Sequence, residues 1–370
     1  MRLAHVIYDL SIGGGAQFLA DLASSMAAGG FEQRVWCIGP AGPPAQELQR
    51  ARVPVTPLNK RTRSGAGVLV RLAGALRSYG PQAVMTHGEA GIIWGLPAAA
   101  LAGIASRLAL VYQNYPETRL RMAAMKSMLP LAAHVVAGSE SVARYVRRAF
   151  GVPQARVSTV HCGIPVERFR QVRRHAAGEH RTLLSIGRMV PRKGHEVLMR
   201  AAALLFPRAA GVRVLLVGDG PCRPALAELA RELGIERRVE FRGAVWPDTP
   251  VWEEADVFVF PSLVEPQGLV VLEAFACGVP VVASDVGGIG EMIEPEVSGL
   301  LVPPGDPAAL ASALERVLTE PGLAEHLAAG GLRRVRQFDI GRTAEIYAEI
   351  LRRLDARSPA GRPGRRGPHG

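Results

Sequence analysis

Two hydrophobic patterns alternate along this chain. Short apolar runs rich in β-branched residues are typical of buried strands, and longer stretches with apolar residues at every third or fourth position are typical of helices. In the first half, the pattern predicts strands at Leu3–Tyr8, Arg34–Ile38, Ala83–Thr86, Leu108–Tyr112 and Val135–Ala137, and helices at Gln17–Ala28 and Gly67–Tyr79. Regular alternation of this kind predicts a parallel sheet covered by helices on both faces.

The same alternation begins again after a polar stretch. Residues 164–180 are rich in arginine and histidine and lack periodicity, as is common at a domain boundary. The pattern then predicts strands at Thr182–Ile186, Arg213–Val217, Val257–Phe260 and Val281–Ser284, and helices near 195–205, 222–233, 268–276 and 307–319. We therefore expect an α/β fold with two facing, Rossmann-like, doubly wound domains.

The predicted domains cover residues 1–170 and 171–355. Helices from Leu323 onward close the second domain, and the last of them is free to cross back to the first. Residues 356–370 form a basic segment rich in glycine and proline that has little to bury, so we expect a disordered tail there.

Composition narrows the class of protein. With 370 residues the chain is long enough for two cores. No apolar run reaches the roughly 18 to 20 residues that span a bilayer, so we expect Gly91–Ala105 to be a buried helix. The first ten residues carry Asp9 and lack the order of a signal peptide, which predicts a cytoplasmic protein. Four cysteines lack metal-ligand spacing and are expected to be packing residues: Cys37, Cys162, Cys222 and Cys277.

Charge is distributed unevenly along the chain. Lys and Arg outnumber Asp and Glu by 21 to 8 over residues 1–176, whereas the counts are 23 and 25 over residues 177–370. A basic half indicates an anionic partner, and an acidic membrane surface fits better than nucleic acid because no nucleic-acid-binding motif is present. A solvated, arginine-rich surface without a partner remains an equal alternative.

Two glutamates eight positions apart limit the chemistry most tightly. Glu265 follows the apolar run that ends at Phe260, and Glu273 lies in the helix predicted at 268–276. Ligands of open α/β sheets bind beyond the carboxyl ends of the strands, where helix N-termini favour anions. Gly268 allows close approach of the backbone. Two carboxylates at such a place accept hydrogen bonds from hydroxyl groups on different parts of one elongated ligand.

Cations and glycines follow other predicted strands. Arg188 lies just past the first strand of the second half, and Lys193 follows five residues later. Two cations at one strand end are suited to a diphosphate, because arginine offers a forked contact and lysine a point charge. In the first half, Gly14 and Gly15 open a helix after the first strand. That signal is weaker, since glycines often serve only to turn the chain.

These segments resemble the retaining GT-B glycosyltransferases, most closely glycosyltransferase family 4. The resemblance covers most of residues 3–350 and is dense from 183 to 306. It implies that Glu265 lies beside the donor sugar, that Glu273 binds the ribose, and that Arg188 and Lys193 neutralise the leaving diphosphate. It also implies contacts with the nucleotide sugar at Gly268, Leu269, Gly218, Gly243, Gly14 and Gly15.

Three glutamines depart from the family pattern. Gln17 replaces an acid in the glycine loop, Gln113 replaces a histidine that contacts the donor sugar in many relatives, and Gln267 replaces an aromatic residue. The residues expected to contact the sugar or the acceptor are His87, Gln113, Asn114 and Gln17.

The resemblance implies a metal-independent, retaining glycosyltransferase that needs no cofactor. Its donor would be a UDP- or GDP-linked sugar, and its acceptor a saccharide or lipid-linked molecule in cell-surface polysaccharide or glycolipid synthesis, at the inner face of the cytoplasmic membrane. No nucleic-acid partner is expected. Two alternatives stay open. A nucleotide-sugar epimerase on the same fold would consume the donor without an acceptor, and a non-catalytic nucleotide-sugar-binding protein would bind the donor without turnover.

Overall fold

The computed structural model describes residues 1–11, 13–60, 65–113, 115, 118–172, 181–245 and 250–357. These residues form two compact units. The first contains Met1–Cys162 together with the C-terminal helix α14 (Ile340–Arg357), and the second contains Gly163–Asp339. Asn114 and the predicted tail from residue 358 onward lie outside the described residues.

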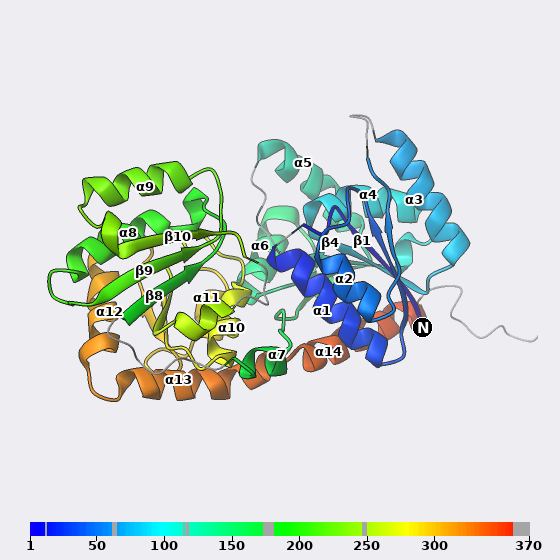
Figure 1. The fold of residues 1–370 in the computed structure, drawn as a ribbon. Helices are drawn as coiled ribbons and strands as arrows, with labels where there is room; N and C mark the ends of the chain where they lie inside the picture. The colour runs from blue at the N-terminus through cyan, green and yellow to red at the C-terminus, as the bar shows by residue number, and fades with distance from the viewer. Residues whose placement is uncertain are drawn as a thin grey trace, which may run out of the picture. The chain divides into compact units, whose positions relative to one another are not determined.

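The first unit is built on a parallel sheet of seven strands in the order β3-β2-β1-β4-β5-β6-β7. The strands are β1 (Arg2–Ile7), β2 (Glu32–Cys37), β3 (Val55–Pro57), β4 (Ala83–His87), β5 (Leu108–Tyr112), β6 (His134–Ala137) and β7 (Val157–Thr159). The helices are α1 (Gly14–Ala28), α2 (Pro44–Arg50), α3 (Ala66–Tyr79), α4 (Gly88–Leu101), α5 (Arg119–Met128) and α6 (Glu140–Phe150). Helices α1 and α2 cover one face of this sheet and α3 to α6 cover the other (Figure 1). Their apolar side chains form a separate core on each face.

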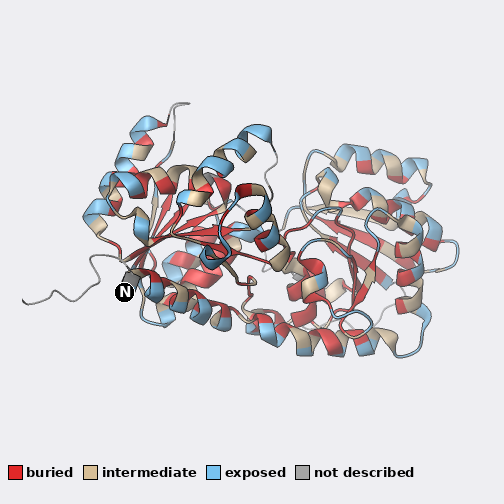
Figure 2. Ribbon diagram, turned by 180° about the vertical axis from the view of Figure 1, so that it is seen from behind, coloured by how far each residue is buried: buried red, intermediate tan, exposed pale blue. Residues whose placement is uncertain are grey.

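The second unit contains a parallel sheet of six strands in the order β10-β9-β8-β11-β12-β13. The strands are β8 (Arg181–Ile186), β9 (Val212–Val217), β10 (Val239–Gly243), β11 (Val257–Phe260), β12 (Val281–Ser284) and β13 (Leu300–Val302). The helices are α7 (Val166–Arg170), α8 (His195–Leu205), α9 (Arg223–Glu232), α10 (Leu269–Ala276), α11 (Ile289–Met292), α12 (Pro307–Thr319) and α13 (Leu323–Arg334). One core packs α8, α9 and α12 on the sheet and another packs α7, α10 and α11, so the central strands β8, β11 and β12 are buried on both faces (Figure 2).

The division between the two units lies between Cys162 and Gly163, whereas the predicted boundary lies between residues 170 and 171. β7 is the last strand of the first sheet, and soon after it the backbone N–H of Ile164 donates to the carbonyl oxygen of Phe338 at 3.0 Å. Helix α7 therefore belongs to the second unit, where Val166 and Phe169 are part of the core. Ile164 pairs there with Asp339, which lies 175 positions further along the sequence and in the same unit.

The last helix packs on the first unit. The ring of Tyr347 in α14 lies 6.1 Å from the ring of Phe18 in α1, and the Gln82 side chain donates to Asp355 at 3.1 Å. The predicted helix at Gly91–Ala105 is α4, where Gly95 lies tightly against Thr86 of β4. In the ranges that the structure describes, no helix is both long enough and apolar enough to cross a lipid bilayer.

Candidate active site

The strand order of each sheet reverses at one point, and the candidate residues lie beside it. In the second unit the reversal lies between β8 and β11, and the loops after these two strands carry Arg188, Lys193 and Glu265. In the first unit the reversal lies between β1, which Gly14 follows, and β4, which ends at His87. Open α/β sheets bind ligands in the crevice that forms at such a reversal.

Glycines bring the loops of the second unit into backbone contact. A Cβ atom on Gly194 would lie 1.9 Å from the carbonyl oxygen of Pro261, and one on Gly287 would lie 1.9 Å from that of Glu265. Their φ angles of +65° and +53° are in the left-handed region that favours glycine. Gly218 approaches Gly187 in the same way, since a Cβ on Gly218 would lie 2.1 Å from the Gly187 carbonyl oxygen. The loops after β9, β8, β11 and β12 thus form one continuous backbone surface.

The central contact on this surface is an ion pair. Lys193 Nζ lies 2.5 Å from Glu265 Oε2, and the exposed fractions of the two side chains are 14% and 8%. Lys193 Nζ also lies 4.8 Å from the centroid of the Phe260 ring, while the Ser262 hydroxyl donates to Glu265 at 3.5 Å. Charges removed from water are costly unless they are paired, so the contact between Lys193 and Glu265 offsets part of the cost of burying them.

Arg188 and Glu273 lie near this pair in the sequence but differ from it in burial. Arg188 is exposed, and its guanidinium makes no ion pair or hydrogen bond within the described parts of the chain. Glu273 is half-buried in the second turn of α10. The structure therefore brings Lys193 and Glu265 into direct contact, whereas the Arg188 guanidinium has no partner among the described residues.

The remaining predicted glycines of the second unit shape the same edge. Gly268 has φ +91° and precedes Leu269, the first residue of α10. A Cβ at Gly268 would lie 2.6 Å from Ile289 Cδ1, so only glycine fits without displacement. Gly218 donates its N–H to the carbonyl oxygen of Gly243 at 2.7 Å, which joins the loops after β9 and β10.

The first unit presents amide groups at its carboxyl edge. A Cβ on Gly15 would lie 3.8 Å from Gln113 Oε1, so the glycine loop and Gln113 are close together. Gln113 Nε2 donates to the Cys162 sulfur at 2.9 Å. Burial raises the pKa of this thiol, and the hydrogen bond from Gln113 lowers it by a smaller amount. Cys162 was expected only to fill space, whereas here it orients the Gln113 amide.

Gln17 is also fixed by hydrogen bonds. Its Nε2 donates to Asp21 at 3.1 Å and to Glu47 at 2.9 Å. Its Oε1 is buried and accepts no hydrogen bond in the described structure. The two carboxylates thus fix the orientation of the Gln17 amide.

A buried hydrogen-bond chain ends at His87, the last residue of β4. Gln33 Nε2 donates to the Ala23 carbonyl at 2.8 Å, so its Oε1 accepts from His5 Nε2 at 2.9 Å. His5 Nδ1 then accepts from His87 Nε2 at 3.1 Å, which leaves His87 Nδ1 as a buried acceptor without a described partner. Burial lowers the pKa of both histidines, to about 4 for His5, and favours neutral rings.

Sequence patterns did not reveal the partners in these contacts. Phe260 and Ser262 flank the ion pair from an ordinary apolar strand and its end, His5 lies inside the first predicted strand, and Gln33 lies just before the second. Only the alternation of β1 and β2, which turns His5 and Gln33 inward, carries a signal for them. As for metals, no three His, Cys, Asp or Glu side chains cluster as ligands among the residues described.

Known proteins resemble the chain over both units. A model described as Glycosyltransferase Family 4 matches residues 12–168, and one described as Glycosyl transferases group 1 matches residues 180–320. D-inositol 3-phosphate glycosyltransferase of Thermobispora bispora is 33% identical over 293 residues, which cover 72% of this chain and 68% of that protein. The chain thus spans about two thirds of this relative.

Solved structures show the same fold. The Anabaena protein HepE in complex with UDP and glucose aligns with a TM-score of 0.85 at 20% identity, over 95% of this chain and 100% of HepE. WaaG, a glycosyltransferase involved in lipopolysaccharide biosynthesis, aligns with a TM-score of 0.73 at 18% identity, over 94% and 99% of the two chains. These likenesses confirm the predicted GT-B class.

Proposed function

Because this chain belongs to glycosyltransferase family 4, we propose that it transfers a sugar from a nucleotide diphosphate sugar to an acceptor hydroxyl with retention of configuration. The observation that carries the proposal is the buried Lys193–Glu265 pair at the point where the second sheet reverses. A cation and a carboxylate are side by side there, which suits a ligand that joins a diphosphate to a sugar.

The proposed chemistry uses each charge in a different place. The bond between the sugar C1 and the diphosphate oxygen breaks, and Lys193 and Arg188 stabilise the negative charge of the departing diphosphate. Glu265 positions the sugar. The acceptor oxygen then bonds to C1 on the same face, and its proton passes to the departing phosphate oxygen. Catalysis would consist of positioning and charge stabilisation. Glu273 binds the ribose hydroxyls in this proposal.

The donor and acceptor classes follow from supporting observations. HepE was solved with UDP and glucose, which supports a UDP-sugar as the donor. A GDP-sugar is the second donor class in this proposal. The basic first half favours a phosphorylated or lipid-linked saccharide acceptor at an anionic membrane surface. The relative named for D-inositol 3-phosphate and the role of WaaG in lipopolysaccharide synthesis agree with this class. We place the enzyme in cell-surface glycan synthesis.

A transfer assay tests the proposal. The full chain is incubated with a panel of UDP- and GDP-sugars and with lipid and saccharide extracts, and release of the nucleoside diphosphate is measured. The expected result is acceptor-dependent release, with a product whose anomeric configuration by NMR equals that of the donor. Consumption of the donor without an acceptor would indicate an epimerase, and tight donor binding without release would indicate a binding protein. Either outcome would overturn the proposal.

A further inference from the structure

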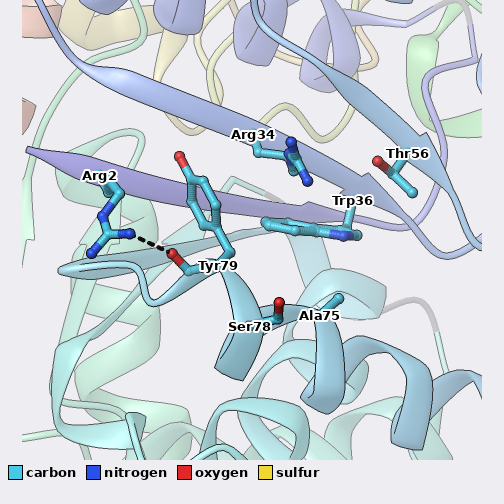
Figure 3. A pocket seen from close by; sticks show the side chains of 7 residues that line it. All are labelled: Arg2, Arg34, Trp36, Thr56, Ala75, Ser78 and Tyr79. Carbon is cyan, nitrogen blue, oxygen red and sulfur yellow. Dashed lines mark hydrogen bonds between the residues drawn. The ribbon is translucent and has the colours of Figure 1, made fainter.

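A cavity of about 420 Å³ lies in the first unit, apart from every residue proposed above for transfer. It lies over β2 and β3 on the face that α3 covers, with the start of β1 and the last turn of α3 at its side (Figure 3). The polar and aromatic side chains that line it are those of Arg2, Arg34, Trp36, Thr56, Ser78 and Tyr79.

Aromatic rings hold one arginine in place. Arg34 and Trp36 are two residues apart in β2, so both side chains lie on the same face of the sheet. The Arg34 guanidinium carbon is 5.9 Å from the centroid of the Trp36 ring and 5.5 Å from that of the Tyr79 ring. Trp36 is 2% exposed and meets Tyr79 edge-on at 5.5 Å. Cation–π contacts engage the flat face of a guanidinium and leave its N–H groups for other acceptors.

The second arginine is fixed by the backbone. Arg2 donates from Nη1 to the Tyr79 carbonyl oxygen at 3.0 Å, which the dashed line in Figure 3 marks. Its other guanidinium N–H groups have no partner among the described residues. Neither Arg2 nor Arg34 forms an ion pair with a carboxylate in that part of the chain. Two preorganised guanidinium groups therefore line one cavity with donors still available.

Other groups in the cavity complete its chemistry. The Ser78 and Thr56 hydroxyls make no hydrogen bond to a described residue and can donate to an anion. One acid, Glu32, lies two residues before Arg34 in β2 and acts on Tyr79 through its charge, and its backbone carbonyl accepts from the Tyr79 hydroxyl at 3.1 Å. Burial, with a smaller effect of the Glu32 charge, raises the pKa of Tyr79 to about 12, so its hydroxyl stays protonated. Hydroxyls and arginines without a paired acid form a lining that favours an anion.

We propose that this cavity binds a phosphate monoester, either free in solution or carried by a lipid headgroup. Arginine matches phosphate oxygens through its forked N–H groups, and the Trp36 and Tyr79 rings provide an apolar wall for the organic part of the ligand. The site is independent of sugar transfer, because none of its residues follows the carboxyl end of β1, β4 or β5.

The test measures binding to the full-length protein by calorimetry and by vesicle sedimentation. Glycerol 3-phosphate is the free probe, and vesicles of phosphatidylcholine with or without phosphatidic acid are the lipid probe. Arg34→Gln removes the guanidinium, and Ser78→Glu adds a negative charge at an exposed position without removing a contact. Arg50→Gln is the control, since Arg50 is exposed in α2 and outside the cavity. Each titration is repeated in Lys193→Ala protein to exclude phosphate bound at the candidate active site.

We expect Arg34→Gln to weaken binding about tenfold or more, the usual effect of losing a charged hydrogen bond. Ser78→Glu should weaken binding by a similar factor because its carboxylate repels the anion, while Arg50→Gln and Lys193→Ala leave binding unchanged. Binding of glycerol 3-phosphate would identify a soluble ligand, and binding of phosphatidic acid vesicles alone would identify a headgroup. Absence of binding to both probes would overturn the proposal. Equal weakening by Arg50→Gln would also overturn it, because the effect would then come from net charge.

Discussion

The carboxyl edges of the two sheets are built in different ways. In the second unit, backbone contacts at Gly194, Gly218 and Gly287 fix the loops around a buried ion pair. In the first unit, the glycine loop is open: a Cβ at Gly13 would have no atom within 4 Å, and one at Gly15 would have its nearest neighbour at 3.8 Å. The first edge uses neutral amides and imidazoles where the second uses charges.

This difference indicates how the two edges divide the work. A rigid, charged edge suits a ligand group that every turnover presents in the same form, such as the diphosphate of a donor. At the open edge, Gln17 and Gln113 are held by side-chain hydrogen bonds to Asp21 and Cys162, so a substitution there removes hydrogen bonds and breaks no ion pair. Each prediction below changes one edge and uses the other, or an exposed position, for comparison.

The largest effect is expected for Lys193→Ala. The substitution removes charge stabilisation of the leaving diphosphate, so kcat should fall about 10²- to 10³-fold, and it leaves Glu265 as an unpaired buried charge. The control is Arg200→Ala, which breaks the exposed pair of Arg200 with Glu196 in α8 and should change neither activity nor stability measurably. Steady-state kinetics and urea unfolding give both quantities. A normal kcat in Lys193→Ala would reject the assigned role.

The glycines provide the second comparison. Gly287→Ala should lower the free energy of unfolding by at least about 2 kcal/mol, because it adds left-handed strain to a clash with the Glu265 carbonyl oxygen. Gly15→Ala should change it by less than about 0.5 kcal/mol, since the position has room. If ligand phosphate approaches the Gly15 backbone, the same variant should raise the donor KM. Chemical denaturation measures the free energy of unfolding of both variants. An equal decrease in Gly287→Ala and Gly15→Ala would show that the two edges are packed alike.

Acid should destabilise the protein through its buried histidines. Burial lowers the pKa of His5 in the first unit and of His195 in the second to about 4. In the unfolded chain the same histidines bind a proton near pH 6.5. Between pH 6.5 and 4 the unfolded state therefore binds more protons than the folded state, so the free energy of unfolding decreases as the pH falls through this range. Each histidine should cost about 2 kcal/mol at pH 5. Unfolding measured from pH 7.5 to 5 should show this slope, and His195→Gln should reduce it; a flat profile would contradict the burial.

The smallest effect is expected for Gln113→Ala. It removes one neutral hydrogen bond to Cys162 and, in the proposed function, one to the sugar. The donor KM should therefore rise about two- to tenfold with little change in kcat. Cys162→Ala separates the two contributions, because it frees the amide without deleting it. A larger loss in Cys162→Ala than in Gln113→Ala would show that the amide acts through the fold.

Much of the architecture could be predicted from the sequence, for a physical reason. Central strands such as β1, β5 and β11 are buried on both faces, so they appear as continuous apolar runs. The edge strands β3 and β13 have three residues each and leave no such run. The contacts divide the chain between Cys162 and Gly163, and the bridge between Ile164 and Asp339, which has no local signal in the sequence, lies within the second unit.

The sequence predicts which edge of the sheet carries the candidate residues, but not which of them touch. Arg188, Lys193 and Glu265 fall after strands that the hydrophobic pattern identifies, so their common edge follows from parallel topology. The direct Lys193–Glu265 contact spans 72 residues and has no local signal. The His5–His87 pair spans 82 residues and is equally hidden. Such pairs depend on strand register, which only the structure provides.

The most direct test is a thermal-shift titration with UDP- and GDP-sugars, which measures whether the site around Lys193 and Glu265 binds a donor. A ligand that binds the folded state raises Tm by mass action. We predict that at least one of these donors raises the Tm of the wild-type protein and that Lys193→Ala abolishes most of this rise, while Arg200→Ala retains it. No shift with any donor, or an equal shift in wild type and Lys193→Ala, would contradict a diphosphate site at this pair.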